Sequence, residues 1–220
     1  MISKKGINFK EILTIFSVIL ILTFSINLFK DIFKEFNLYL TIFLSLSIII
    51  ILNVLIKKFV AYLLDSELEM KLWESKKRKL RKKWKEKTVS FPLGIIIPVL
   101  SRFLFFAFGN FIWMASLIFE VKPRIYRSAK RYGLYSFSEM SEYHMAIIAA
   151  LGILMNLFVS LLFYLFGFET SAKLALYYSF FNLLPIGELD GNKIFYGKML
   201  WWAVLALIVL IGLFFSVLIV

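Results

Sequence analysis

Long apolar runs separated by short charged loops constrain the fold of this chain more than any other feature. A helix needs about 20 mainly apolar residues to cross a hydrocarbon layer of roughly 30 Å. Five runs are candidates for such crossings: Ile12–Phe29, Leu38–Leu63, Met145–Phe166, a short Leu174–Leu184, and Met199–Val220. Because 61% of the 220 residues are hydrophobic, the chain carries more apolar surface than one soluble core can bury. The sequence therefore predicts an all-α polytopic membrane protein.

A sixth apolar segment, Phe91–Phe119, has a different character. It contains helix-breaking or polar residues along its length, namely Pro92, Pro98, Arg102, Gly109 and Asn110. A helix that breaks within a membrane exposes backbone polar groups, which is tolerated only where protein or water satisfies them. We therefore expect a re-entrant or interfacial hairpin here, and five to six membrane segments in total.

The distribution of cations predicts the orientation of the chain. Lysine and arginine favour cytoplasmic loops, and two predicted spans separate the N-terminal lysines from a basic stretch, Lys71–Lys87. The loop at 30–35 between those spans has two lysines and two acidic residues, which suits the outer face. We expect a multi-pass protein of the cell membrane, with a cytoplasmic N-terminus and basic stretch and an outer C-terminus. This orientation explains the net charge of +12, so no nucleic-acid partner is expected.

The same pattern divides the chain into three parts. Residues 1–37 form an N-terminal span and outer loop, 38–202 a membrane core with a basic insertion at 64–90, and 199–220 a C-terminal span. Inside the insertion, Leu68, Met70 and Leu72 alternate with charged residues, which is typical of a strand. A second strand is expected at Leu117–Val121, so that the helical bundle includes a short strand pair.

The basic stretch continues with a helical spacing. Trp73, Leu80 and Trp84 lie seven and four residues apart, as one helical face requires. We expect a basic amphipathic helix that binds anionic lipid headgroups. A charged helix in solvent is the alternative, because such a helix also carries a thin apolar stripe.

A polar string follows the fourth apolar run. It reads Asn182-Leu183-Leu184-Pro185-Ile186-Gly187-Glu188-Leu189-Asp190-Gly191. An acidic residue at the edge of a membrane usually has a partner or a function. The alternative is a simple helix end, in which Pro185 stops the span and Asp190-Gly191 turns the chain.

The string resembles the Asn-x-x-Pro-x-x-x-Leu-Asp-Gly signature of site-2 proteases, which are intramembrane zinc metalloproteases. Two further segments, Ala149–Asn156 and Leu52–Ala61, are similar to the family's small-residue helix and to its His-Glu-x-x-His helix. The order of the pieces resembles compact archaeal-type members without a PDZ domain. The resemblance covers about Leu38–Trp202 and implies a site-2-protease-like helix bundle in which Asp190 is the equivalent of a zinc ligand.

The chain departs from that family where the metal would be held. The positions of the two histidines and the glutamate carry Asn53, Lys57 and Val54. Catalytic zinc needs three protein ligands and a water, and a lysine cation and a valine supply none. The degenerate positions predict no intact catalytic residues and no bound metal. The lone histidine, His144, is expected to be an interfacial side chain.

The resemblance suggests a replacement for the metal. Asn53 and Lys57 are four residues apart and share a helix face, the face that in the family looks toward the aspartate. The Lys57 ammonium would then neutralise Asp190. Alternatively, Lys57 extends to the cytoplasmic interface beside Lys58. Further residues expected to line a cleft are Asn156, Asn182, Pro185 and Gly191.

The predicted function is non-catalytic: a degenerate site-2 protease-like protein that binds a partner's membrane segment without cleaving it, by backbone pairing at Leu117–Val121. One alternative is an active metalloprotease that binds zinc through His144, Asp190 and Glu188. Another is a transporter or channel component, whose path would be formed by Asn53, Lys57, Arg102, Asn156, Asn182 and Asp190. The chain has no cysteine, which excludes disulfides and thiolate chemistry.

Overall fold

Among the residues that the computed structural model describes, four helices are long and apolar enough to cross a membrane. The structure describes residues 8–28, 36–78, 88–104, 112–123 and 140–218. The four helices are α1 (Phe9–Asn27), α2 (Phe36–Leu63), α5 (Glu142–Leu165) and α8 (Met199–Leu218). They support the predicted multi-pass membrane protein. The N-terminal lysines Lys4 and Lys5 and the loop at 30–35 lie outside the described residues.

The fourth predicted run forms a shorter helix. It lies in α6 (Glu169–Leu183), which has 15 residues and so extends roughly 22 Å. The helix ends before Pro185, which has no backbone N–H to continue it. Since α6 is shorter than a full crossing requires, the fifth crossing stays a prediction.

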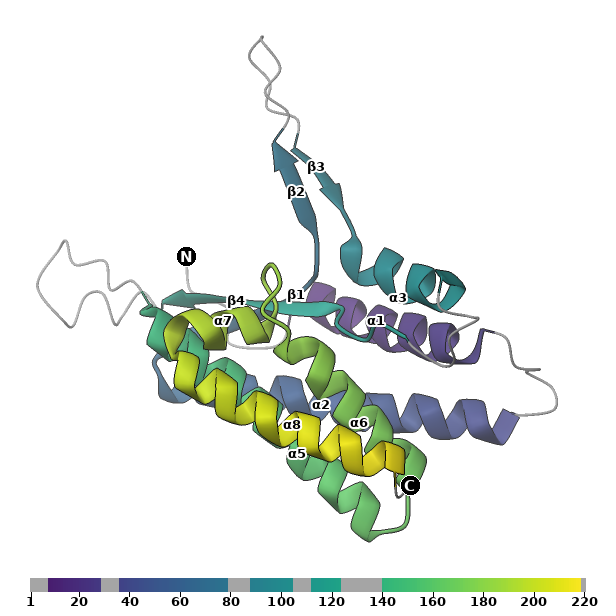
Figure 1. The fold of residues 1–220 in the computed structure, drawn as a ribbon. Coiled ribbons are helices and arrows are strands. Elements are labelled where there is room, and N and C mark those ends of the chain that lie inside the picture. Colours follow the sequence, from purple (N-terminus) through teal and green to yellow (C-terminus); the bar gives the residue numbers. More distant parts are fainter. Residues whose placement is uncertain (1–7, 29–35, 79–87, 105–111, 124–139, 219–220) are drawn as a thin grey trace, which may run out of the picture.

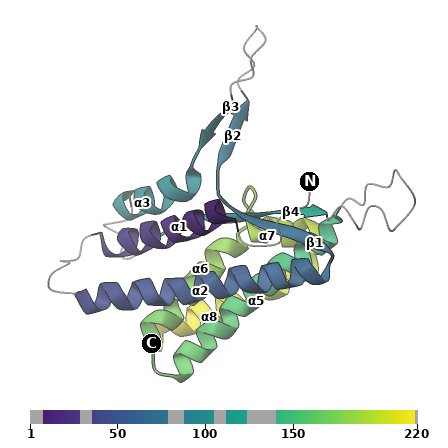
Figure 2. The same cartoon turned by 180° about the vertical axis from the view of Figure 1, so that it is seen from behind.

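Helix α5 is the centre of the bundle. It packs against α2, α6, α8 and the short helix α7 (Asp190–Gly197), as Figures 1 and 2 show from opposite sides. Its buried face carries small residues, including Ala146, Ala149, Ala150 and Gly152. Small side chains let membrane helices approach closely, so this face can receive several neighbours.

Large apolar side chains on the outer faces of the bundle are exposed. On α8 they include Leu207, Leu210, Ile211 and Phe214, and α8 runs along the outside of α5 and α6 (Figure 1). A contiguous apolar surface of this kind is stable only against lipid or another protein. The bundle therefore presents the surface expected of a membrane protein.

The predicted strand pair is present. Strand β1 (Ser66–Leu72) pairs antiparallel with β4 (Leu117–Pro123), with Met70 opposite Phe119. Leu68 and Met70 are buried, whereas Glu67 and Glu69 are partly exposed, which is the alternation read from the sequence. Asp65, with φ of 52°, turns the chain from α2 into β1.

The prediction of a basic amphipathic helix is wrong for the part of that stretch that the structure describes. Ser75–Arg78 forms strand β2, which pairs antiparallel with β3 (Thr88–Phe91) and projects from the bundle (Figure 1). Trp73 does not begin a helix, because its N–H continues the strand pairing and donates to the Ser116 carbonyl at 2.9 Å. Trp73 is also buried rather than interfacial. Leu80 and Trp84 lie outside the described residues.

The segment that carries Pro98 also differs from expectation. Helix α3 (Leu93–Leu104) continues through Pro98 and packs against α1. Pro98 has no backbone N–H to donate within the helix, yet the helix is not broken there. The Pro98 carbonyl accepts a hydrogen bond from the Ser101 hydroxyl. With 12 residues, α3 is too short to cross a membrane, as expected. Gly109 and Asn110 lie outside the described residues, so the hairpin stays a prediction.

Candidate functional site: a buried lysine–aspartate pair

The centre of the site is an ion pair between α2 and α7. The Nζ atom of Lys57 lies 2.5 Å from Oδ2 of Asp190, and the two side chains are 3% and 1% exposed. The contact expected from the resemblance is therefore present, and Lys57 does not extend to the interface. It is the adjacent Lys58 that turns away, to pair with Glu11 at 2.7 Å. A buried charge is costly unless it is paired, so the two charges of the site depend on each other.

Two glycines make room for this pair. A Cβ atom on Gly152 would lie 2.3 Å from Cε of Lys57, so the lysine can pass α5 only where there is no side chain. A Cβ atom on Gly191 would lie 1.9 Å from the carbonyl oxygen of Leu183. The bare backbone at Gly191 therefore lets the start of α7 lie against the end of α6, which places Asp190 beneath Lys57. As the first residue of α7, Asp190 also benefits from the positive end of the helix dipole.

Three buried amide side chains surround or adjoin the pair. Asn53 donates through Nδ2 to the Gly152 carbonyl at 2.9 Å, and Asn182 donates to the Tyr178 carbonyl at 2.9 Å. Asn156 lies one turn beyond Gly152 on the same face of α5 and is fully buried, yet neither polar atom of its amide has a hydrogen-bond partner among the described residues. Oδ1 of Asn53 and Oδ1 of Asp190 also have no partner in the part of the chain that the structure describes. This part of the described core therefore retains unused hydrogen-bonding capacity. Each buried group without a partner lowers the stability of the fold by about 1–3 kcal/mol.

A second cation, Lys193, belongs to the site but was not predicted. Its ammonium donates to the backbone carbonyl of Phe119 in β4 and lies 3.5 Å from the centre of the Phe119 ring. The Lys57 ammonium is 5.3 Å from the same ring. Burial lowers the pKa of Lys193 to about 8, although the negative charge of Asp190 acts in the opposite direction. The one sequence signal for Lys193 is its position three residues after Asp190, on the same helix face.

The outer edge of β1 also bonds to a charged side chain, as β4 bonds to Lys193. Glu11 of α1 is buried and accepts the Met70 N–H at 2.9 Å, while its other oxygen binds Lys58. Because the Met70 N–H points away from β4, Met70 and Phe119 form a non-hydrogen-bonded pair. A charged side chain therefore engages each edge of the sheet at this one level. Sequence analysis missed Glu11, since an acid near the start of an apolar run gives no hint of a backbone partner.

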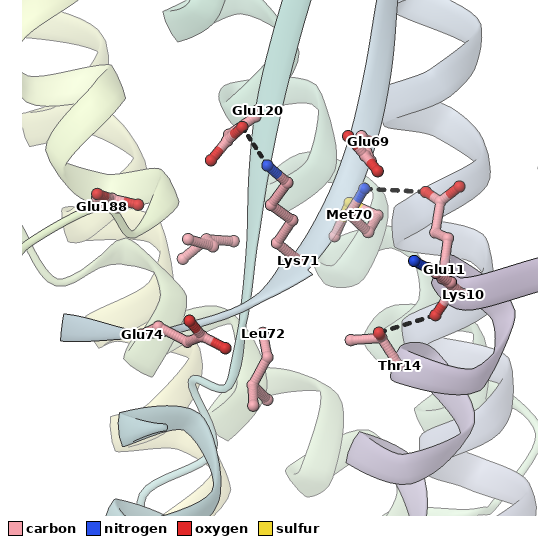
Figure 3. A pocket seen from close by; sticks show the side chains of 11 residues that line it. Lys10, Glu11, Thr14, Glu69, Met70, Lys71, Leu72, Glu74, Glu120 and Glu188 are labelled. Atoms are coloured by element: carbon pink, nitrogen blue, oxygen red, sulfur yellow. Dashed lines mark hydrogen bonds and ion pairs between the residues drawn. The ribbon is translucent and has the colours of Figure 1, made fainter. Parts of the chain in front are cut away.

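A pocket of about 330 Å³ lies on the polar face of the sheet. Figure 3 shows Lys71 reaching across to Glu120, with Glu69, Glu74 and Glu188 nearby. The Lys71 ammonium is 2.5 Å from the Glu120 carboxylate, and this hydrogen bond raises the pKa of Lys71. The described part of the basic stretch thus contributes one lysine that is already paired within the protein.

The remaining predicted residues occupy different places. Val54 is buried in the core, and Pro185 is exposed where α6 ends. His144 lies at the start of α5, where its Nδ1 atom is 2.8 Å from the Ser141 hydroxyl. Arg102 is buried in α3, which packs chiefly against α1. Within the part of the chain that the structure describes, no group of three or more histidine, cysteine or acidic residues is placed to hold a metal.

The residues at the resembling positions do not fit zinc. Asp190 directs one oxygen to a lysine cation, and Asn53 uses its amide nitrogen on the backbone of α5. Val54 offers no proton acceptor in place of the family's glutamate. A zinc ion at Asp190 would face the Lys57 ammonium, a like charge in a low-dielectric interior. Asp190 is thus arranged as the partner of a lysine.

The chain matches no known family model, no curated protein and no solved structure.

Proposed function

We propose that this protein is a non-catalytic, site-2-protease-like membrane protein that binds a membrane segment of a partner without cleaving it. The Lys57–Asp190 pair is the observation that carries this proposal. A cation from the helix that resembles the His-Glu-x-x-His helix sits on the aspartate of the Leu-Asp-Gly string. These two positions are 133 residues apart, and their contact supports the resemblance. The arrangement favours a structural charge pair in place of a metal.

The outer edge of β4 is the proposed docking element. The register implies that the backbone groups of Leu117, Phe119 and Val121 point away from β1. An added strand would form hydrogen bonds with these groups, as in other cases of strand addition. The Phe119 carbonyl is already engaged by Lys193, so a client strand displaces that ammonium. Among the described residues, the amide of Asn156 and the Oδ1 atom of Asn53 have no hydrogen-bond partner, and they provide a further donor and further acceptors for an unwound segment.

The proposal keeps the orientation inferred from the sequence. The N-terminus and the basic stretch Lys71–Lys87 lie in the cytoplasm, and anionic lipid headgroups are partners of that stretch. The chain lies in the cell membrane and its client is another membrane protein.

A crosslinking experiment tests the proposal. A photoreactive residue is placed at Lys122, whose side chain is 64% exposed, and membranes from cells are irradiated. We expect a discrete adduct with an intact membrane protein. Val121→Pro removes an outward N–H without removing a bond between β1 and β4, and is expected to abolish the adduct. Val121→Ala retains the N–H and is expected to preserve the adduct.

Two results contradict the proposal. The first is an identical adduct in the proline and alanine variants when both elute as folded protein. The second is a client fragment cut within its membrane segment that disappears in Asp190→Asn, which would indicate an active protease.

A further inference from the structure

A second site lies on the lipid-facing side of the bundle, away from the Lys57–Asp190 pair. It is a groove of about 610 Å³ between α5, α6 and α8, three helices that lie side by side in Figures 1 and 2. Pockets that take small molecules have volumes of about 300–1,000 Å³. The groove is therefore large enough for an extended molecule. Two of the three helices that line it, α5 and α8, are long and apolar enough to cross a membrane.

The two ends of the groove differ in polarity. One end is lined by apolar side chains, among them Leu154, Leu157 and Ile208. The other end carries four polar side chains, Tyr164, Glu169, Lys173 and Ser216. It lies where α5 ends at Leu165 and α6 begins at Glu169. A tyrosine at the end of a membrane helix is typical of the headgroup level, so the polar end belongs at the membrane surface.

The polar end is not satisfied by the described part of the protein. The ion pairs formed within the described part of the protein involve neither Glu169 nor Lys173. Ser216 is 5% exposed, and its hydroxyl has no hydrogen-bond partner within the described ranges. Glu169 and Lys173 are one helical turn apart and so share a face. A cation, an anion and a buried hydroxyl group thus converge at the end of an apolar trough.

We propose that this groove binds a phospholipid with a primary-ammonium headgroup, of the phosphatidylethanolamine class. One acyl chain lies in the apolar trough, the phosphate binds Lys173, the ammonium binds Glu169, and the Ser216 hydroxyl donates to an ester carbonyl oxygen. The phosphate of an anionic lipid would also bind Lys173, but such a lipid has no ammonium group to pair with Glu169. A partner's helix would cover both charged side chains and remove them from water, which is unfavourable.

Native mass spectrometry of the purified protein tests this site. The protein is incubated in detergent with equal amounts of phosphatidylethanolamine, phosphatidylcholine and phosphatidylglycerol. We expect the phosphatidylethanolamine adduct to dominate. Glu169→Gln removes the partner of the ammonium and is expected to shift the preference toward phosphatidylglycerol. Lys173→Gln is expected to weaken all three adducts.

A matched pair of tryptophan variants locates the acyl chain. Leu161 lines the groove, whereas Leu207 faces outward on α8 and is not part of it. If Leu161→Trp displaces about two methylene groups from the trough, the adduct weakens about tenfold. Leu207→Trp is expected to leave it unchanged.

Three outcomes overturn the proposal. One is a set of equal adducts for the three lipids in the unmodified protein. Another is an equal response to Leu161→Trp and Leu207→Trp. The third is a photo-crosslink from position 161 to a helix of another membrane protein, because a helix would then occupy the groove.

Discussion

At the scale of single residues, the buried charges of this protein are held by specific partners rather than by solvent. Lys57 and Asp190 neutralise each other in the core, and Glu11 satisfies both Lys58 and the backbone of β1. Such pairs contribute little when exposed. Removing one member of a buried pair, however, leaves an uncompensated charge at a cost of about 3–5 kcal/mol.

The first prediction concerns the central pair. Lys57→Met and Asp190→Asn are each expected to destabilise the protein by several kcal/mol, whereas the double variant loses less than the sum, because neither charge is then left alone. Unfolding in mixed detergent and dodecyl sulfate micelles measures the four free energies. Lys198→Met, at an exposed lysine, is the control and should change little. Additive effects of the two variants would show that the charges do not interact.

The second prediction concerns Lys193 and pH. Burial lowers its pKa from 10.5 to about 8, so above pH 8 the folded chain releases a proton that the unfolded chain keeps until pH 10.5. The free energy of unfolding therefore rises with pH across this window, by at most about 1.4 kcal/mol per unit. Below pH 8 both states are protonated and this contribution is constant. Lys193→Met should remove the rise, and a rise of equal size in that variant would assign it to other groups.

At the scale of elements, the β1–β4 pair connects parts of the chain that are distant in sequence. Helix α1 contacts β1, and the Lys193 side chain of α7 bonds to β4. Two-stranded sheets are marginal alone, so these contacts from neighbouring helices stabilise the pair. The edges of the sheet are thereby protected from unspecific pairing.

A third prediction tests the contact between α1 and β1. Glu11→Ala removes the acceptor of the Met70 N–H. Loss of this hydrogen bond, which stabilises the closed state of the amide by about 1 kcal/mol, should speed its hydrogen exchange about fivefold. Glu11→Gln keeps an acceptor oxygen and should leave the exchange rate near that of the unmodified protein. Mass-resolved or NMR-detected exchange in detergent gives both rates. Equal rates in the two variants would mean that the Met70 amide does not depend on Glu11.

Local patterns in the sequence predicted some elements well and failed at others. The alternation at Leu68 and Met70 predicted β1 because one face of the strand is buried. The spacing of Trp73 and Leu80 suggested a helix, but pairing between Ser75–Arg78 and Thr88–Phe91 is a non-local contact that no helical periodicity reveals. Lys57 and Asp190 were identified through a resemblance. Glu11 and Lys193 were missed because each bonds to a backbone group of the sheet, and a backbone partner carries no residue-specific signal.

At the scale of the whole molecule, the charged and extended elements gather toward one end of the bundle. Strands β1 and β4 and helix α7 lie together there, and the turn between α5 and α6 lies at the opposite end (Figure 1). Long apolar helices connect the two ends. This polarity suits a protein with one face toward the cytoplasm and one toward the outside.

The fourth prediction tests that orientation. The chain has no cysteine, so single-cysteine variants have no background reaction. Phe168→Cys, at an exposed position between α5 and α6, should react with a membrane-impermeant maleimide in intact cells. Ser75→Cys in β2 should react only after permeabilisation. The reverse pattern would show that the chain is inserted with its basic stretch outside.

The long separation of Lys57 from Asp190 also affects how the chain is made. Lys57 emerges from the ribosome 133 residues before Asp190, so α2 enters the membrane with an unmatched cation. Lys57 lies six residues before the end of α2, roughly 9 Å from the helix end, close enough for its flexible side chain to reach water in the nascent protein. The ammonium can turn inward only once α7 has been synthesised and docked. Closure of the core is therefore a late step in biogenesis, and nascent chains that end before residue 190 should expose Lys57 to quality control.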